Sequence, residues 1–263
     1  MGDGGYNGVL VNGDSDNVLE GPVTLLGSSR YQAYATTGSL RFRGGISGNA
    51  TFTFAYGNAI VEQVPLSLGG GWLFIHSGNL TLLNGGHSWA ASSIGWEGVL
   101  RAGAAYVLPA DKPFLMGSYD AGVQVQAAGR ATFDLNGCAQ GIGSLGTEGS
   151  VLAAGVSSGA TRVIWSAAPA ALTVWQAATN TFDGAVTGQV SVVKAGVAPL
   201  TLAGTNTTFG SFTVSNGTLR VGATGTLGVN STNVVVAGGT LSLAHSASIS
   251  DQATLQLLAG GQV

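Results

Sequence analysis

Residues 182–221 read FDGAVTGQVSVVKAGVAPLTLAGTNTTFGSFTVSNGTLRV, and a five-residue pattern within this stretch repeats along the chain. The pattern consists of two small residues, a large apolar residue, a polar residue and a second apolar residue. About ten copies occur, roughly 12 to 39 residues apart, which is typical of proteins built from stacked supersecondary repeats. The copies begin at Gly38, Ala50, Gly78, Gly98, Ala131, Ala170, Ala198, Gly217, Gly239 and Ala253.

Each copy has the alternation of apolar and polar residues that is expected of a half-buried β-strand. In residues 217–221, Leu219 and Val221 fall on one face of the strand and Arg220 on the other. A single short strand cannot bury its apolar face alone. A second strand stacked about 4.8 Å away pairs with its backbone and covers its side chains. The repeats therefore predict a solenoid whose core consists of ladders of stacked side chains.

The composition favours strands over helices. The chain has 263 residues, of which 44 are glycine, and each glycine inside a helix costs about 1 kcal/mol relative to alanine. We therefore expect almost no helix. The sequence is 45% hydrophobic and 8% charged, whereas average soluble domains contain about 25% charged residues. Disorder caused by charge and polarity is thus excluded, because the chain has too much apolar surface to stay solvated.

Charge and cysteine content exclude several classes of protein. The net charge is −3 and the nine Lys and Arg residues are scattered, so we predict no nucleic-acid binding. The longest uncharged stretch, residues 221–250, is rich in Gly, Asn, Ser and Thr, and we expect no membrane insertion in this chain. The lone Cys138 cannot form an internal disulfide and is expected to pack in the core. Residues 257–263 read as the start of another coil, which predicts that the chain is a fragment of a longer array.

Several motifs resemble a known family. They are FDGA at 182–185, KAG at 194–196, LTLAGTNT at 200–207 and GTLRV at 217–221. In this order they resemble the F-x-G-x-I, K-x-G, L-T-L-x-G-x-N-T-Y and G-T-L-x-V segments of the autotransporter-associated β-strand repeat of passenger domains. Residues 131–145, ATFDLNGCAQGIGSL, are similar to the stretch between such repeats. The resemblance is specific over residues 130–263. Residues 1–75 match only in their general composition and pattern, and we expect them to form a cap or divergent coils.

The resemblance implies that residues 1–263 form a single right-handed parallel β-helix, a β-solenoid of about 10 to 12 coils. It implies a secreted protein or one on the bacterial cell surface, associated with the outer membrane through regions outside this chain. The expected function is structural, display or adhesive, because the repeat carries no catalytic residues in the family. It implies no cofactor, and it implies host or environmental glycans or surface proteins as partners.

A polysaccharide-degrading β-helix enzyme, either a lyase or a hydrolase, is the main alternative. Such enzymes need converging carboxylates, or carboxylates together with Arg or Lys. The 12 acidic residues are scattered, and only Asp14 and Asp16 lie within a few residues of each other. Adjacent coils could still bring together Asp111 with Asp120, or Glu97 with Arg101. We predict that the chain is not an enzyme and has no catalytic residues.

Three further patterns lack the context that a functional site requires. Residues 12–20 place oxygen ligands at alternate positions, but Val23 stands where a calcium loop needs a bidentate Glu, so we predict an Asx turn. Residues 141–146, GIGSLG, match the dinucleotide fingerprint without a helix after the glycines. The three histidines, His76, His87 and His245, show no ligand spacing, and we predict no metal site.

Trp72, Trp89 and Trp96 form, with Phe74, the densest aromatic group of the chain. Exposed aromatic faces contact sugar rings and partner surfaces. These three tryptophans are therefore the candidate contact residues for glycans or partners, and they define a second alternative, a carbohydrate-binding module. The continuous apolar run at residues 72–75 favours burial instead. Loss of glycan binding on changing Trp89 or Trp96 to Ala distinguishes the two interpretations.

Overall fold

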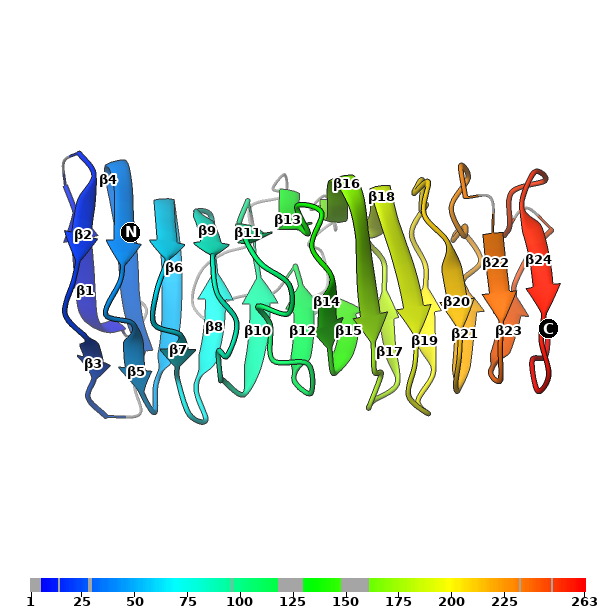
Figure 1. Ribbon diagram of the computed structural model, residues 1–263, viewed down its shortest axis with the longest axis horizontal. Helices are drawn as coiled ribbons and strands as arrows, with labels where there is room; N and C mark the ends of the chain where they lie inside the picture. The colour runs from blue at the N-terminus through cyan, green and yellow to red at the C-terminus, as the bar shows by residue number, and fades with distance from the viewer. Residues whose placement is uncertain are drawn as a thin grey trace, which may run out of the picture.

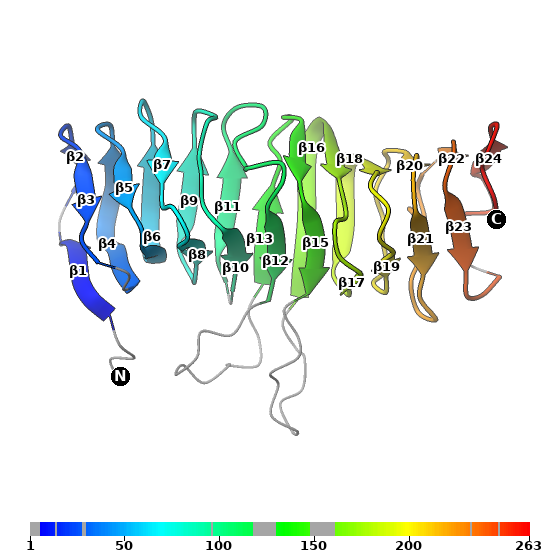
Figure 2. The ribbon, with the colours of Figure 1, turned by 90° about the horizontal axis from the view of Figure 1, so that it is seen from below.

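The computed structural model describes residues 6–263 except residues 14, 28–29, 96, 118–129, 148–160, 232 and 247. These residues are all-β, and their parallel strands stack as a β-solenoid of about 10 turns. In Figure 1 the turns follow one another along the long axis, from blue at the N-terminus to red at the C-terminus. Figure 2 shows the same stack from below, with the termini at opposite ends. The prediction of an all-β parallel β-helix is confirmed.

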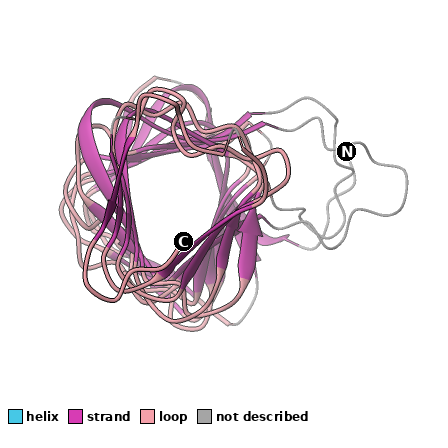
Figure 3. Cartoon of the chain, turned by 90° about the vertical axis from the view of Figure 1, so that its right-hand side faces the viewer, coloured by secondary structure: helices cyan, strands magenta, loops and turns pink. Residues whose placement is uncertain are grey.

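Each turn contributes segments to three faces, which surround a common centre when seen along the long axis (Figure 3). Face 1 contains β1 (Tyr6–Asn12), the first parts of β4 (Arg30–Phe42) and β6 (Thr51–Val61), β8 (Trp72–Ile75), β10 (Ala91–Ile94), β12 (Pro113–Met116), β15 (Ser144–Thr147), β17 (Asn180–Phe182), β19 (Leu200–Leu202), β21 (Thr218–Val221) and β23 (Thr240–Leu243). Face 2 contains β2 (Asn17–Leu19), the second parts of β4 and β6, β9 (Asn79–Leu82), β11 (Val99–Ala102), β13 (Arg130–Asp134) and the first parts of β16 (Thr161–Val174) and β18 (Ala185–Lys194). Face 3 contains β3 (Val23–Leu25), β5 (Ile46–Gly48), β7 (Leu66–Ser67), β14 (Gln140–Ile142), the second parts of β16 and β18, β20 (Phe212–Val214), β22 (Asn233–Val236) and β24 (Thr254–Leu257).

The core consists of ladders in which equivalent residues of successive turns stack. On face 2 one ladder runs through Leu80, Leu100, Phe133 and Ile164, each of which is fully buried. The rings of Phe133 and Phe114 also pack against each other, with centroids 4.7 Å apart, so that faces 1 and 2 share one core. This stacking is the reason a five-residue strand is stable here, because its inner side chains are covered by the turns on both sides.

Glycine allows the chain to turn the corners between faces without leaving the stack. Gly57 adopts φ +79° in the middle of β6. A β carbon at this position would lie 1.9 Å from the carbonyl oxygen of Ala35 in the preceding turn. Gly188 turns the next corner, between faces 2 and 3, within β18, with φ +70° and only 2.2 Å between a β carbon and the carbonyl oxygen of Ser166. The left-handed backbone and the close approach both require glycine.

The repeated five-residue pattern marks strands, but it does not mark one particular face of each turn. The copy at Gly38 lies on face 2, the copy at Ala50 on face 1 and the copy at Ala170 on face 3. All copies except the last two bury both of their large apolar residues. The prediction of inward apolar ladders is confirmed for these copies. The unequal spacing of the copies in the sequence follows from their positions on different faces.

Candidate functional site

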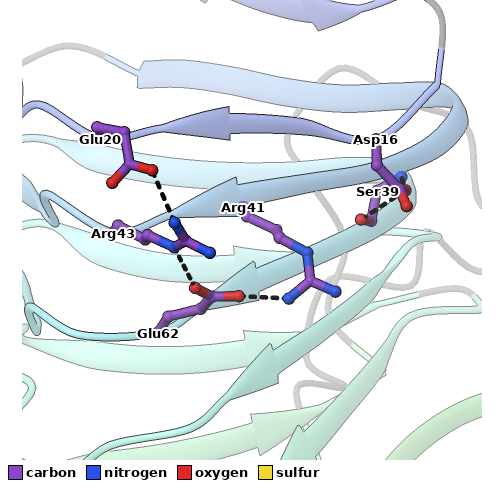
Figure 4. A network of polar contacts seen from close by, with 6 residues as sticks. All are labelled: Asp16, Glu20, Ser39, Arg41, Arg43 and Glu62. Carbon is purple, nitrogen blue, oxygen red and sulfur yellow. Dashed lines mark hydrogen bonds and ion pairs between the residues drawn. The ribbon is translucent and has the colours of Figure 1, made fainter.

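A network of charged side chains joins the first turns on the outer surface of face 2 (Figure 4). Arg43, after β4, donates from Nε to Oε2 of Glu62 (2.7 Å) and from Nη1 to Oε1 of Glu20 (2.7 Å). Arg41 makes a further hydrogen-bonded ion pair with Glu62. Nearby, Oδ1 of Asp16 accepts from the backbone N–H (2.7 Å) and the hydroxyl (2.8 Å) of Ser39. Every one of these contacts connects one turn to the next.

Hydrogen bonds within this network favour the ionised form of Glu62 and of Asp16. Hydrogen bonds from Arg43 and Arg41 hold the pKa of Glu62 below its usual value. The hydroxyl and the backbone N–H of Ser39 lower the pKa of Asp16 in the same way. A carboxylic acid that donates a proton in glycoside cleavage needs a raised pKa. The lowered pKa values of Glu62 and Asp16 are the opposite of what such a proton donor needs, and they fit charged contacts that hold successive turns together.

Replacing Glu62 with Gln is expected to lower the thermal midpoint of unfolding by a few degrees at most. The substitution removes the carboxylate that lies between two guanidinium groups, but the side chains of Arg41 and Arg43 are each about one-third exposed, and such pairs are weak. The deficit should disappear at about 1 M salt, where charges are screened within roughly 3 Å. A loss that is the same at low and high salt would show that packing, and not charge, is responsible.

Two smaller ion pairs also connect turns. Arg101 lies 3.5 Å from Asp134 and donates from Nη2 to Asn136 (2.7 Å). The buried Arg162 pairs with Asp183 at 3.0 Å. Arg101 is thus brought to Asp134 and not to Glu97, the partner considered from the sequence. The other pair is not testable, because Asp120 lies outside the described residues, while Asp111 makes an ion pair with the adjacent Lys112 (2.7 Å).

The three candidate tryptophans do not form one exposed surface. Trp89 is 1% exposed, and its indole N–H donates to the hydroxyl of Ser92 (2.7 Å). Trp72 is half-buried and stacks with Phe74, their centroids 6.3 Å apart. Trp96 lies outside the described residues. The structure does not support the prediction that Trp89 is a contact residue, because its ring lies in the core under the corner that leads to β10.

Exposed aromatic rings occur instead around the Gly188 corner. Trp165, in β16, is 37% exposed and Phe209 is 64% exposed. Cδ1 of Trp165 lies 3.1 Å from the place where a β carbon of Gly188 would stand. The backbone N–H of Phe209, in the following turn, donates to the carbonyl oxygen of Gly188 (2.8 Å). Trp165 thus lies in the turn before Gly188 and Phe209 in the turn after it, so that the two residues are two turns apart, which is about 10 Å along the solenoid.

The remaining sequence patterns have structural roles. Oxygen groups of residues 12–20 face different partners: Asn12 donates to the carbonyl oxygen of Ser15 (3.0 Å), whereas Glu20 pairs with Arg43. Asp14 lies outside the described residues. The glycines of residues 141–146 lie in and between β14 and β15, where a β carbon at Gly143 would approach the carbonyl oxygen of Asp111 to 2.3 Å. Within the described part of the chain no group of three His, Cys, Asp or Glu could hold a metal ion.

The histidines and the cysteine each have local contacts. His76 packs edge-on against Tyr56, with centroids 6.2 Å apart, and burial lowers its pKa. His87 is buried and stacks on Trp89 at 5.5 Å. His245 contacts the carbonyl oxygen of Gly225 at 2.7 Å. Cys138 is partly buried and packs against the core, in agreement with the packing role expected from the sequence.

Buried polar side chains at the corners were not recognised in the sequence. Lys194 is fully buried, and its Nζ donates to the carbonyl oxygens of Ala195 (3.0 Å), Gly196 (2.9 Å) and Asn216 (3.0 Å). Gln140 and Asn206 bind backbone groups of neighbouring turns in a similar way. The one available signal is alternation, because Lys194 has the same parity as the inward-facing Val190 and Val192 of β18.

Comparison with known proteins yields no relatives. No family model matches the chain, and neither a curated protein nor a solved structure matches it. The resemblance of residues 130–263 to the autotransporter-associated repeat stays a prediction.

Proposed function

We propose that this chain is a non-catalytic β-helical segment of a secreted or cell-surface bacterial protein, which displays another region or adheres through its flank. Regions outside the chain would associate it with the outer membrane. The observation that supports the proposal is that charged side chains form ion pairs between successive turns. The networks around Glu62, Asp134 and Asp183 are formed between different turns, so that they reinforce a continuous stack. With about 4.8 Å per turn, the stack is a rod of roughly 50 Å.

Adhesion to a glycan is the more specific form of this proposal, and the exposed rings of Trp165 and Phe209 favour it. Sugar rings present C–H faces that pack on aromatic rings, and their hydroxyl groups need nearby polar partners. Thr187 pairs with Trp165 in the parallel ladder, and the exposed Gln189 follows Gly188. Thr187 therefore supplies a hydroxyl group in the turn next to Trp165, and the amide oxygen of Gln189 is a further acceptor, since its amide nitrogen donates to the carbonyl oxygen of Ala167 (2.8 Å). In this proposal the glycan lies along the rod at this corner, and not at Trp72, Trp89 or Trp96.

Affinity electrophoresis in polysaccharide gels tests the adhesive form. We expect a polysaccharide that retards the wild type to retard Trp165→Ala and Phe209→Ala at least several-fold less. Trp175→Ala is the matched control, because Trp175 is 52% exposed but lies after β16, at the other end of this strand. Equal retardation of all three variants would contradict a contact at Trp165 and Phe209.

An assay for reducing ends and unsaturated products on the same polysaccharides tests the non-catalytic proposal. Product formation by the wild type that is lost in a variant of Glu62, Asp134 or Asp183 would overturn it. In that case the polysaccharide lyase or hydrolase function, the main alternative, would apply. Binding without product supports the adhesive form, whereas neither binding nor product supports a purely structural or display role.

A further inference from the structure

Five asparagines of the chain are followed directly by glycine: Asn7, Asn12, Asn84, Asn136 and Asn216. Asparagine is a thermolabile residue, because the backbone nitrogen of the next residue can attack its side-chain carbon Cγ and displace the amide group. Glycine in the second place favours the attack, since it has no side chain that hinders the approach. The folded structure decides which pairs can react, because the reacting groups must lie close together and be free to move.

Asn216 is exposed at the corner between β20 on face 3 and β21 on face 1. The backbone N–H of Gly217 donates to Oδ1 of Asn216 at 2.8 Å. Because Oδ1 is bonded to Cγ, the nitrogen of Gly217 lies beside the carbon that it would attack, and a five-membered ring results. Among the described residues, no other group is hydrogen-bonded to the side chain of Asn216. Its amide nitrogen is therefore free to leave.

The fold requires the glycine that makes this pair reactive. Gly217 has φ +63°, and a β carbon there would lie 2.5 Å from the carbonyl oxygen of Gly196 in the preceding turn. The places that correspond to Asn216 in the neighbouring turns, two residues after the paired positions of β18, β20 and β22, are Gly196 and Gly238. Neither glycine has a side chain that could cover Asn216. The reactive pair is thus a part of the corner itself.

The same two groups are held apart at Asn136. Its Nδ2 donates to the carbonyl oxygen of Ala102 (3.1 Å), so that the amide group is anchored to the preceding turn. The backbone N–H of Gly137, which would be the attacking group, donates to the hydroxyl of Ser166 (2.9 Å) and not to its own neighbour. Asn136 therefore has the reactive dipeptide without the reactive geometry.

The remaining described pairs are anchored as well. Nδ2 of Asn84 donates to the carbonyl oxygen of Gln63 (3.0 Å), and its Oδ1 is buried. Asn12 is 4% exposed, and its Nδ2 donates to the carbonyl oxygen of Ser39 (3.2 Å). The side chain of Asn7 lies outside the described part of the chain. Of the four pairs whose side chains are described, that of Asn216 alone combines exposure with a nitrogen placed at its own side-chain carbonyl.

We propose that Asn216 is a site of spontaneous deamidation and isomerisation in the folded protein. The deprotonated nitrogen of Gly217 forms a bond to Cγ, the bond from Cγ to Nδ2 breaks, and the NH2 group takes up a proton and leaves as ammonia. Water then opens the succinimide ring at either carbonyl carbon, which gives aspartate or isoaspartate. Either product makes the net charge of −3 more negative by one. Isoaspartate also adds one carbon to the main chain at the corner where Nζ of Lys194 contacts the carbonyl oxygen of Asn216 (3.0 Å).

The test follows the Asn-Gly pairs of the wild type in one sample. The full chain is incubated at about pH 8.5 in water enriched in ¹⁸O, which marks the oxygen taken up before digestion, and peptide mass spectrometry gives the extent of deamidation at each asparagine. We expect Asn216 to react about tenfold faster than Asn136, or more, because the nitrogen of Gly217 is already in place and that of Gly137 is not. In a parallel sample unfolded in guanidinium chloride the two rates should approach each other.

Two variants identify the products. Asn216→Asp is the standard for the aspartate form on ion exchange, and Asn216→Gln is the matched control, because glutamine keeps an exposed amide but cannot close a five-membered ring. Enzymatic methylation of isoaspartyl carboxylates should label the peptide around Asn216 in the aged wild type and leave the same peptide of Asn216→Gln unlabelled. Equal rates at Asn216 and Asn136 in the folded chain would overturn the proposal. An unchanged difference in guanidinium chloride would also overturn it, because the neighbouring sequence and not the fold would then be the cause. None of these outcomes depends on glycan binding or on catalysis.

Discussion

Acidification from pH 6.5 to about pH 4 is expected to lower the free energy of unfolding through His87, the pKa of which burial lowers from 6.5 to about 4. One pKa unit corresponds to about 1.4 kcal/mol, so the loss is roughly 3 kcal/mol. This is a large part of the stability of a typical domain, which is about 5–15 kcal/mol.

The geometry around His87 explains why the folded protein resists protonation there. Nδ1 accepts the backbone N–H of Leu66 at 2.8 Å, so it cannot carry a proton while this bond exists. The ring lies on Trp89 in the core, and burial lowers the pKa of His87 more than a backbone hydrogen bond at Asn84 raises it. The unfolded chain takes up a proton at a higher pH than the folded chain. Stability is therefore complete above pH 6.5 and decreases as the pH falls towards the folded pKa.

Urea denaturation between pH 4.5 and pH 7 measures this effect. In His87→Asn the side-chain oxygen can accept the N–H of Leu66 without titrating, and we expect the pH dependence to become much flatter. His76→Asn is the control, because burial lowers the pKa of His76 as well. Glu62 and Asp16, whose pKa values are lowered, lose their contribution only as the pH falls through those lowered values. If His87→Asn keeps the full slope of the wild type, the imidazole of His87 is not its origin.

The alternation of apolar and polar residues predicted which side chains of most strands face the core and which face outward. It could not predict the face, because a five-residue strand has the same pattern on all three faces. The lengths of the corners then decide the position of each copy. Gly57 turns the chain within β6, whereas the longer link between β12 and β13 includes residues 118–129. Both connect the same two faces.

Some strands lack the pattern altogether. In β10 the sequence ASSI has no alternation, yet it pairs with β8 and β12 on either side. Ser92 points into the core, where the indole N–H of Trp89 donates to its hydroxyl. Tertiary pairing overrides local propensity at this position. The same contact buries Trp89, which the sequence had offered as a contact residue.

The charged contacts between turns could not be predicted from the sequence, for a related reason. Arg43 reaches Glu20 in the turn before and Glu62 in the turn after. Such a contact depends on the register of three turns, and the register depends on every corner between them. The placement of Trp165 and Phe209 in the turns before and after Gly188 depends on register in the same way. Sequence reasoning therefore located the core better than it located the surface.

Replacing Lys194 with Met is expected to lower the free energy of unfolding by about 2–3 kcal/mol, because the buried carbonyl oxygen of Ala195 loses its donor. Burial lowers the pKa of Lys194 to about 8, so the side chain is still an ammonium group at neutral pH. Its three N–H groups serve three carbonyl oxygens of two successive corners. One of them belongs to Gly196, which has φ +74° and lies too close to the carbonyl oxygen of Trp175 to accept a β carbon.

Equilibrium denaturation at pH 7 separates the contribution of the hydrogen-bond donors of Lys194 to stability from the contribution of its packing. Met keeps most of the volume of Lys without any donor, whereas Lys194→Ala also leaves a cavity and should lose a further 2 kcal/mol or so. Val214→Ala is the matched control for volume, since Val214 pairs with Lys194 in the next turn and makes no side-chain hydrogen bond. A Met variant as stable as the wild type would mean that the cost of burying the ammonium group cancels its hydrogen bonds, as occurs for some buried charges. In that case the K-x-G motif would contribute to the register of the corner, and not to its stability.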